Sequence, residues 1–254
     1  MIGQVAPMTK WEEERIGNAT ASGITPLFEE ATRPMTEEEK KNRPKKDNGK
    51  GGLIFENAGT TIIDHNLWTV GAWTYIDEKI AELTTNTFRK VENFSTDYGS
   101  QQEPLAISML KVTYPNLTYY GKETQEFFRY SDFSGGSPDW AEFSLKLIGE
   151  IKCPENPANH IKYCRILTGD QLRKEKKEHW HQVQFNMLCV AKNMGWNYME
   201  TNGLFVSFCD LINFPFKKLH TIEILPNPRF EERAKFIINK YEKELSSQLK
   251  FLRQ

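Results

Sequence analysis

Apolar side chains recur every three to four residues in four long segments of the chain, which predicts four amphipathic helices. These segments are residues 68–83, 97–112, 176–194 and 230–252. Pro104 lies within the second segment, so its regular helix is expected to begin near that residue. Gly195 follows the third segment directly and is a typical helix terminator. A shorter helical signal covers residues 10–16.

Runs rich in aromatic and β-branched residues lie between these segments and predict strands. They cover residues 117–120, 127–130, 143–152, 204–208 and 219–225. The sequence Gly-Gly-Ser-Pro at residues 135–138 predicts a turn. We therefore expect an α/β fold, with a central mixed β-sheet flanked by helices, formed by a single domain over residues 1–254.

Residues 33–52 interrupt this pattern of helices and strands. They contain Arg33-Pro34, Arg43-Pro44 and the run Asp47-Asn48-Gly49-Lys50-Gly51-Gly52. Proline, glycine and clustered charge at this density predict a flexible loop or an insertion. Because the globular composition continues on both sides, we do not expect a domain boundary here.

The composition is that of a globular protein: 39% of the 254 residues are hydrophobic and 26% are charged. No apolar run approaches the ~18 residues of a membrane span, and no signal peptide or anchor is predicted. Four cysteines without a CxxC pair indicate reduced thiols in a cytoplasmic protein. The net charge of -1 does not by itself indicate nucleic-acid binding. Basic residues do gather in residues 40–50 and 162–177, where solvated surface is the ordinary interpretation.

The most informative chemistry lies in Ser137-Pro138-Asp139 and in Glu150-Ile151-Lys152. A hairpin of two strands would bring Asp139 and Glu150 to one edge of the sheet. Glu150 and Lys152 are two residues apart on a strand, so they project to the same face. Ile151 then points into the core, and its backbone carbonyl lies between the two polar side chains.

Two carboxylates and a carbonyl oxygen form a hard-oxygen site suited to Mg²⁺. Such an ion polarises a phosphodiester and lowers the pKa of bound water. A nearby ammonium group orients the attacking water or stabilises charge at the phosphorus centre. The set of two acids and a lysine therefore favours metal-assisted phosphodiester hydrolysis. The alternative is an aspartate in an ordinary turn and an exposed Glu-x-Lys pair.

Two further positions add polar groups to this picture. Glu103 shares the apolar stripe of its helix with Ala106, Ile107 and Leu110, if the helix extends beyond Pro104. A carboxylate there needs a cation or a partner, although a glutamate favoured at a helix start is the alternative. Gln182 and Gln184 carry amides that can hold phosphate oxygens, or they form an ordinary polar helix face.

These elements together resemble the phage lambda exonuclease (YqaJ-like) family of the PD-(D/E)XK nuclease superfamily. Five segments carry the resemblance in the order of the family's motifs. They are residues 11–22 (WEEERIGNATAS), residues 99–103 (GSQQE), Ser137-Pro138-Asp139, residues 149–154 (GEIKCP) and residues 182–185 (QVQF). Residues 23–95 and the C-terminal tail match only in general character.

The resemblance implies a role for each motif residue. Asp139, Glu150 and the carbonyl of Ile151 would ligate Mg²⁺, for which Mn²⁺ can substitute. Glu103 would complete the acidic cluster, Lys152 would act on the nucleophilic water, and Gln182 would lie beside the active site. The positions that hold a terminal 5′-phosphate in the family match Arg15, Ser22 and Ser137. Ala158 stands where the family's first member has a phosphate-binding arginine, for which Asn159, His160 or Lys162 are the candidate substitutes.

The implied activity is a 5′-to-3′ exonuclease that degrades linear double-stranded DNA from its ends and leaves 3′ single strands for phage-type recombination. The resemblance also implies a homo-oligomer, often a trimeric ring, and a phage single-strand annealing protein as partner. Two alternatives remain at this point. An endonuclease of the same superfamily would use the same acids and lysine, and a DNA-binding protein would lack catalysis altogether.

Overall fold

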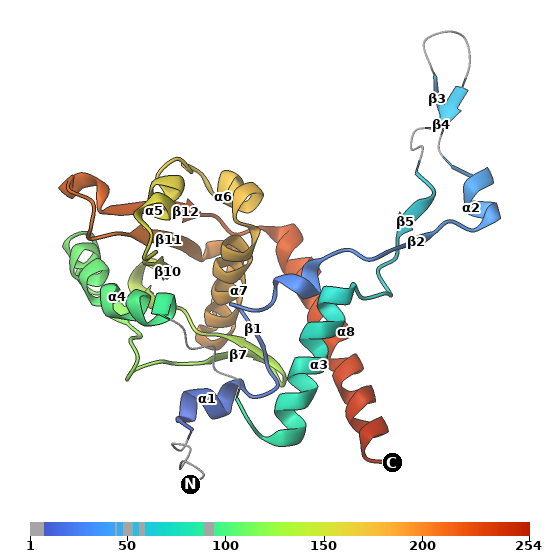
Figure 1. The fold of residues 1–254 in the computed structure, drawn as a ribbon, viewed down its shortest axis with the longest axis horizontal. Coiled ribbons are helices and arrows are strands. Elements are labelled where there is room, and N and C mark those ends of the chain that lie inside the picture. The colour runs from blue at the N-terminus through green and yellow to red at the C-terminus, as the bar shows by residue number, and fades with distance from the viewer. Residues whose placement is uncertain (1–7, 44, 48–52, 56–58, 89–93) are drawn as a thin grey trace.

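A five-stranded mixed sheet forms the centre of the computed structural model, which describes residues 8–43, 45–47, 53–55, 59–88 and 94–254 (Figure 1). The strand order is β12-β11-β10-β9-β6. Only β10 and β11 run parallel in this sheet, and the chain between them forms three helices, as a parallel connection requires. The strands are β6 (Thr118–Tyr119), β9 (Trp140–Glu142), β10 (Leu147–Lys152), β11 (Asn202–Phe208) and β12 (Leu219–Ile224).

A second, three-stranded sheet has the order β1-β8-β7. Its members are β1 (Ala19–Thr20), β7 (Phe128–Ser131) and β8 (Ser134–Gly136). β1 pairs with β8 in parallel, so the carboxyl ends of these two strands lie at the same edge. The turn predicted at residues 135–138 is wrong in its first half, because Gly135 and Gly136 belong to β8.

Eight helices are present in the described part of the chain. They are α1 (Lys10–Arg15), α2 (Glu37–Lys41), α3 (Val70–Thr85), α4 (Phe94–Thr113), α5 (Pro157–Tyr163), α6 (Gly169–Glu175), α7 (Lys177–Met194) and α8 (Pro228–Leu252). The four long helices predicted from spacing are all present. Helix α4 continues through Pro104 rather than beginning near it. Among the described residues, none of these helices combines the length and apolarity needed to cross a membrane.

Helices α4 and α7 contact β10 and β11 and build two separate cores. Ala106, Ile107 and Leu110 of α4 share one apolar cluster with Ile151, which confirms their predicted stripe. Helix α7 shares the other cluster with Ile148, whose side chain projects from the opposite face of β10 to that of Ile151. The two helices therefore cover opposite faces of β10.

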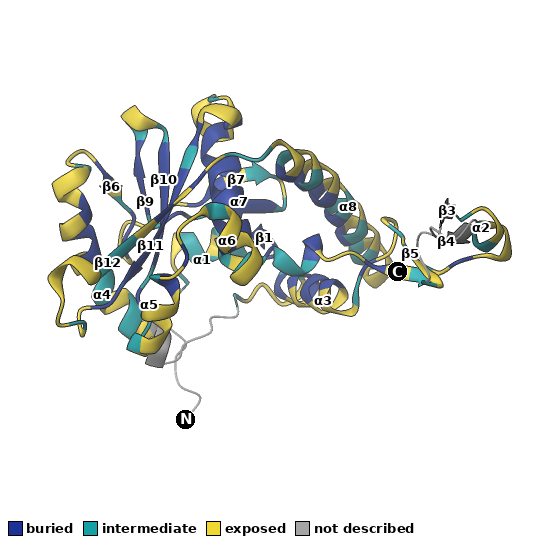
Figure 2. Ribbon diagram, turned by 90° about the horizontal axis from the view of Figure 1, so that it is seen from above, coloured by how far each residue is buried: buried dark blue, intermediate teal, exposed yellow. Residues whose placement is uncertain are grey.

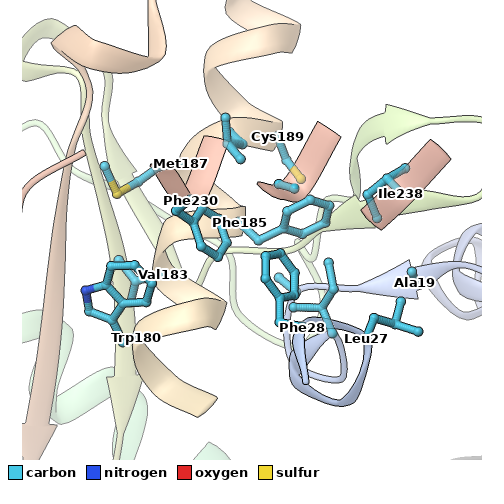
Figure 3. Packing of buried hydrophobic residues seen from close by; sticks show 14 of the residues in the cluster. Ala19, Leu27, Phe28, Trp180, Val183, Phe185, Met187, Cys189, Phe230 and Ile238 are labelled. Atoms are coloured by element: carbon cyan, nitrogen blue, oxygen red, sulfur yellow. The ribbon is translucent and has the colours of Figure 1, made fainter. Parts of the chain in front are cut away.

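Helix α7 is buried on all sides rather than on the single face predicted. Every residue from 180 to 191 is buried, because α7 contacts the three-stranded sheet as well as the five-stranded one. Figure 3 shows Phe185 and Trp180 of this helix packed with Phe28 and Phe230 from distant segments. The helix ends at Gly195, whose φ of 67° is left-handed, as its position predicted.

Residues 33–52 are predicted to be a flexible loop or an insertion; the described residues of this segment form short strands and a helix rather than a loop, and the insertion stays a prediction. The described residues lie in an arm that projects from the body of the molecule in Figures 1 and 2. Its elements are β2 (Thr32–Pro34), α2, β3 (Lys45–Asp47), β4 (Leu53–Phe55) and β5 (Thr61–Ile63), with β2 paired to β5 and β3 to β4. Thr36 and Glu39 cap α2 reciprocally, and Arg33 binds both Glu39 and Asp64. These local hydrogen bonds stabilise a helix and strands in a segment whose prolines and glycines predicted a loop.

Candidate active site

The predicted hairpin of Asp139 and Glu150 is present, formed by β9 and β10. The two strands are antiparallel, with Trp140 opposite Gly149. The backbone N–H of Asp139 donates to the carbonyl of Gly149 at 3.1 Å, which extends the pairing by one residue. This register places Asp139 opposite Glu150 at the end of the hairpin. A Cβ at Gly149 would lie 1.8 Å from Cε2 of Trp140, so glycine is required beside the glutamate.

Glu150 and Lys152 project from the same face of β10, as predicted. The Lys152 ammonium donates to Oε1 of Glu150 at 2.6 Å. The backbone N–H of Ile151 donates to Oδ2 of Asp139 at 2.5 Å, which ties the two strands together at the acidic end. Glu150 is only 2% exposed, and Ile151 is buried in the α4 core. The strand therefore holds both acids and the lysine in one fixed arrangement.

Glu103 approaches this site from the α4 side of the sheet. Its Oε2 accepts a hydrogen bond from the hydroxyl of Tyr119 at 3.2 Å. Burial, together with the charge of Asp139, raises the pKa of Glu103 to about 7. Glu103 is thus half-buried and electrostatically coupled to the hairpin, although it does not line the same pocket.

Burial shifts the protonation equilibria of the two hairpin acids and of Lys152. Burial, followed by the charge of Asp139, raises the pKa of Glu150 to about 8. Burial also raises the pKa of Asp139, although Lys152 opposes the change. For Lys152 itself, burial lowers the pKa, but the attraction of Glu150 and Asp139 outweighs it and the pKa is raised. Lys152 is therefore a permanent cation at neutral pH.

The donor chemistry of this site fits a hard divalent cation. Asp139, Glu150 and the Ile151 carbonyl offer only oxygen ligands, and the raised carboxyl pKa values indicate buried negative charge that a cation would stabilise. Within the described residues, however, no three His, Cys, Asp or Glu side chains are gathered closely enough to form a metal-binding group. The two hairpin acids with the carbonyl are thus the set that fits, and Glu103 stands on the other side of the sheet.

A pocket of about 200 Å³ opens directly beside the two acids. Asp139, Glu150, Lys152 and Gln182 all line it, so Gln182 lies in the same pocket as the two acids. The other lining residues come from α1 (Trp11 and Arg15), from the segments that follow β1 and β8 (Ser22, Ser137 and Pro138) and from the segment between β6 and β7 (Tyr120 and Gln125).

The parallel pairing of β1 with β8 explains why Ser22 and Ser137 meet in this pocket. Each serine follows the carboxyl end of its strand, and parallel strands end at the same edge. Arg15 donates to the Ser22 hydroxyl at 3.3 Å, and the Trp11 indole N–H donates to the Ser137 hydroxyl at 2.9 Å. The three predicted phosphate-binding residues are therefore brought together.

Arg15 retains donor capacity within the pocket. Its guanidinium lies 4.3 Å from the centre of the Trp11 ring, and its buried Nε has no hydrogen-bond partner. Burial lowers the pKa of Arg15 to about 10, against the attraction of Tyr75, Glu82 and Glu150. A desolvated guanidinium with an unused N–H is suited to an anionic ligand with several oxygens.

The sequence did not identify three residues that support the site. Trp11 holds Ser137 and Arg15, Tyr119 holds Glu103, and Asn186 donates to Oε2 of Glu150 at 3.2 Å. Asn186 lies four residues after Gln182 on α7, so helical spacing from that glutamine was the available signal.

Gln184 does not contribute to the site. Its amide is fully buried, donates to the carbonyl of Leu225 at 2.7 Å and accepts from the hydroxyl of Tyr198. Its role is structural, so the phosphate-binding interpretation is wrong for this residue.

The candidate substitutes for the arginine missing at Ala158 lie outside the pocket. His160 is buried, with its ring held by the hydroxyl of Ser207 and the carbonyl of Lys217. Lys162 donates to the side chain of Asn159 at 3.4 Å on the same helix. Arg15 is therefore the cation of the pocket besides Lys152, among the residues that line it.

Solved exonuclease structures are similar to this fold. The crystal structure of an alkaline exonuclease (LHK-Exo) from Laribacter hongkongensis matches with a TM-score of 0.64 at 19% identity, over 96% of this chain and 95% of that chain. Its complex with dAMP gives the same TM-score and coverage at 20% identity. A phage-related exonuclease from Haemophilus somnus 129PT matches with a TM-score of 0.59 at 16% identity, over 92% of this chain and 96% of that one. No family model matches the chain, and no curated protein matches it significantly in sequence.

At these identities the likeness concerns the fold. It confirms the predicted α/β class with a mixed sheet flanked by helices. It also supports the resemblance to the lambda exonuclease family at the level of the fold.

Proposed function

We propose that the chain is a metal-dependent DNA exonuclease. One observation carries the proposal: the acids and lysine of the β9–β10 hairpin share a single pocket with Arg15, Ser22 and Ser137. The pocket thus offers oxygen ligands for a cation and donors for an anion side by side. The similarity to solved exonuclease structures supports the same function.

In this proposal Asp139, Glu150 and the Ile151 carbonyl hold Mg²⁺ or Mn²⁺, with Glu103 adding charge from the α4 side. The bound ion would supply polarisation of the scissile phosphate and a lowered pKa for the attacking water. Lys152 is protonated, so it orients that water as a donor and stabilises charge at the phosphorus centre rather than accepting a proton. Gln182 would donate its amide to a phosphate oxygen beside these groups.

Arg15, Ser22 and Ser137 would hold the terminal 5′-phosphate. A phosphate fixed there would orient the end of the strand toward the acids, which gives a 5′-to-3′ direction and leaves a 3′ single strand. We include in the proposal a homo-oligomer, trimeric by resemblance, and a single-strand annealing partner in phage-type recombination in the host cytoplasm. These last features rest on the family resemblance.

The experiment that tests the proposal is digestion of linear duplexes that carry a label at either end. The duplexes differ only in a 5′-phosphate or a 5′-hydroxyl, and each is incubated with Mg²⁺, with Mn²⁺ or with EDTA. We expect metal-dependent release of nucleotides from the 5′ end, faster for the phosphorylated duplex.

Closed circular DNA provides the control for an endonuclease, because an exonuclease needs an end. Cleavage of the circle would replace the proposal with the endonuclease alternative. Binding of duplex ends without release of nucleotides under either metal would instead support the alternative of a DNA-binding protein that lacks catalysis.

A further inference from the structure

Glu150 is held by a second side chain that belongs to α7 rather than to the hairpin. Lys152 donates to its Oε1 at 2.6 Å, and the amide of Asn186 donates to its Oε2 at 3.2 Å. Both carboxylate oxygens therefore have a donor, one charged and one neutral. The two donors come from separate elements, so they fix the rotation of the carboxylate about its own axis.

The amide of Asn186 donates to Glu150 of the proposed site, whereas the amides of Gln184 and Asn193 on the same helix donate to backbone carbonyls. Asn186 is fully buried, and its Oδ1 has no hydrogen-bond partner. A buried amide oxygen without a hydrogen-bond partner costs free energy of desolvation. Gln184 on the same helix is equally buried, but both ends of its amide are satisfied by structural partners. Asn186 is thus poorly explained as a stabilising residue.

The amide of Asn186 fits against β8 because Gly136 on that strand has no side chain. A Cβ at Gly136 would lie 2.3 Å from Oδ1 of Asn186. Gly136 directly precedes Ser137, so the strand that ends at the pocket also makes room for the residue that holds Glu150. The approach of α7 to this strand therefore depends on a glycine at this position.

We propose that Asn186 is a positioning residue that orients Glu150 for metal binding. This inference rests on the proposed function, because it assigns Asn186 a role toward the ion that Glu150 would hold. Residues that orient a metal ligand from outside the coordination sphere typically change metal affinity 10–100-fold when they are replaced. A residue that only fills space would change stability and leave metal affinity unaltered.

The test measures Mn²⁺ binding directly, by the loss of the free-ion electron paramagnetic resonance signal, in the full chain without DNA. Asn186→Leu keeps nearly the same volume without a donor, and Asn186→Asp keeps the shape but faces Glu150 with an acceptor. We expect both variants to weaken Mn²⁺ binding about 10–100-fold. Circular dichroism of the metal-free proteins verifies that each variant is folded.

Asn193→Ala is the matched control, because Asn193 is another α7 amide and donates to the carbonyls of Arg129 and Cys189. It is expected to bind Mn²⁺ as the wild type does. Gly136→Ala is the second variant, since it leaves Asn186 in place but displaces its amide, and it is expected to weaken Mn²⁺ binding in the same direction. Wild-type affinity in folded Asn186→Leu and Gly136→Ala proteins would overturn the inference alone. Absence of Mn²⁺ binding by the wild type would overturn the metal site of the proposed function and the inference with it.

Discussion

Replacing Lys152 with methionine tests the centre of the proposed chemistry. The substitution keeps the length of the side chain and removes the ammonium group that lies 2.6 Å from Oε1 of Glu150. The lysine side chain is 32% exposed, so one end of it remains open to the pocket while Glu150 is 2% exposed. The variant therefore removes one cation that has two roles: it pairs with the buried Glu150, and in the proposed function it acts at the reacting centre.

The size of the effect follows from these two contacts. Loss of a positioned group that acts on the transferred proton or on charge in the transition state typically costs about 10²–10⁴-fold in rate. Breaking a buried ion pair from one side costs roughly 3–5 kcal/mol when the remaining charge stays ionised. Lys152 lowers the pKa of Glu150, so its removal raises that pKa above the wild-type value of about 8, and the loss of stability should be small at pH 6 and grow toward this range only above pH 8.

The assay compares Lys152→Met with Lys218→Met on a linear 5′-phosphorylated duplex with Mg²⁺. Lys218 also pairs with a carboxylate at 2.6 Å, that of Asp210, and its side chain is 28% exposed. We expect nucleotide release to fall at least 100-fold in the first variant and to stay within threefold in the second, with binding of duplex ends retained in both. A Lys152→Met protein that keeps a tenth of the wild-type rate would refute the assigned role. An equal loss of nucleotide release in Lys218→Met would show that removing any paired lysine charge slows the reaction, so that the effect is not specific to Lys152.

Three further predictions follow from the same geometry. Glu103 and Glu150 bind protons more tightly when folded, so the metal-free protein should lose stability as the pH rises from the ordinary carboxyl pKa of 4.5 to about 7 to 8. Mn²⁺ should therefore raise the melting temperature more at pH 8.5 than at pH 6, and an equal rise at both would contradict this. Arg15→Lys should slow digestion of 5′-phosphorylated duplex about 10–100-fold and leave the 5′-hydroxyl duplex within threefold, since the planar fork and its stacking are lost. Gly149→Ala should destabilise the fold by about 1–3 kcal/mol or more in urea denaturation, whereas Gly71→Ala, where an added Cβ meets no atom closer than 4.0 Å, should not destabilise it.

Much of the site was predictable because its chemistry is local in sequence. Glu150 and Lys152 share a strand face at a spacing of two residues, and the hairpin brings Asp139 opposite. Helical spacing likewise identified the four long helices and the stripe of α4. In each case the periodicity of a single element determines which side chains lie together.

The remaining features depend on residues far apart in the chain, where spacing carries no information. In α3 the apolar residues at helical spacing include Val70 and Trp73, yet these two are 85% and 36% exposed. The helix instead buries Lys79 and Glu82, because these two form an ion pair and Glu82 accepts the N–H of Gly17, 65 residues away. In the sequence, a buried ion pair that depends on a hydrogen bond from a distant segment cannot be distinguished from two charges on a solvated helix face.

Asn186 and Gln184 illustrate the same limit within one helix. Both are fully buried amides, yet one contacts Glu150 and the other the carbonyl of Leu225. Their roles differ because Asn186 reaches β10 at the site, whereas Gln184 reaches the segment that follows β12. The sequence predicts the helix, but only the placement of the helix against the sheet decides which amide reaches the site.

The two halves of the pocket predict a coupling between metal and DNA end. Burial disfavours the ionised forms of Asp139 and Glu150, which a bound cation would stabilise, and Arg15 has an unused donor, so the two halves suit ligands of opposite sign. A terminal nucleotide and a divalent ion bound together would satisfy both halves, and the attraction between them would favour simultaneous binding. Couplings of this kind typically change affinity about 5–150-fold, equally in both directions.

This coupling is measurable without cleavage in the Lys152→Met variant. Fluorescence anisotropy gives its affinity for a 5′-phosphorylated duplex with and without Mn²⁺, and the metal titration gives the affinity for Mn²⁺ with and without duplex. We expect each ligand to strengthen the other by the same factor, and the factor to shrink when Arg15 is also replaced by lysine. Independent binding of the two would mean that the acids and the arginine serve separate ligands. A phosphate held at Arg15 and an ion held at Glu150 would lie in the same pocket and attract each other.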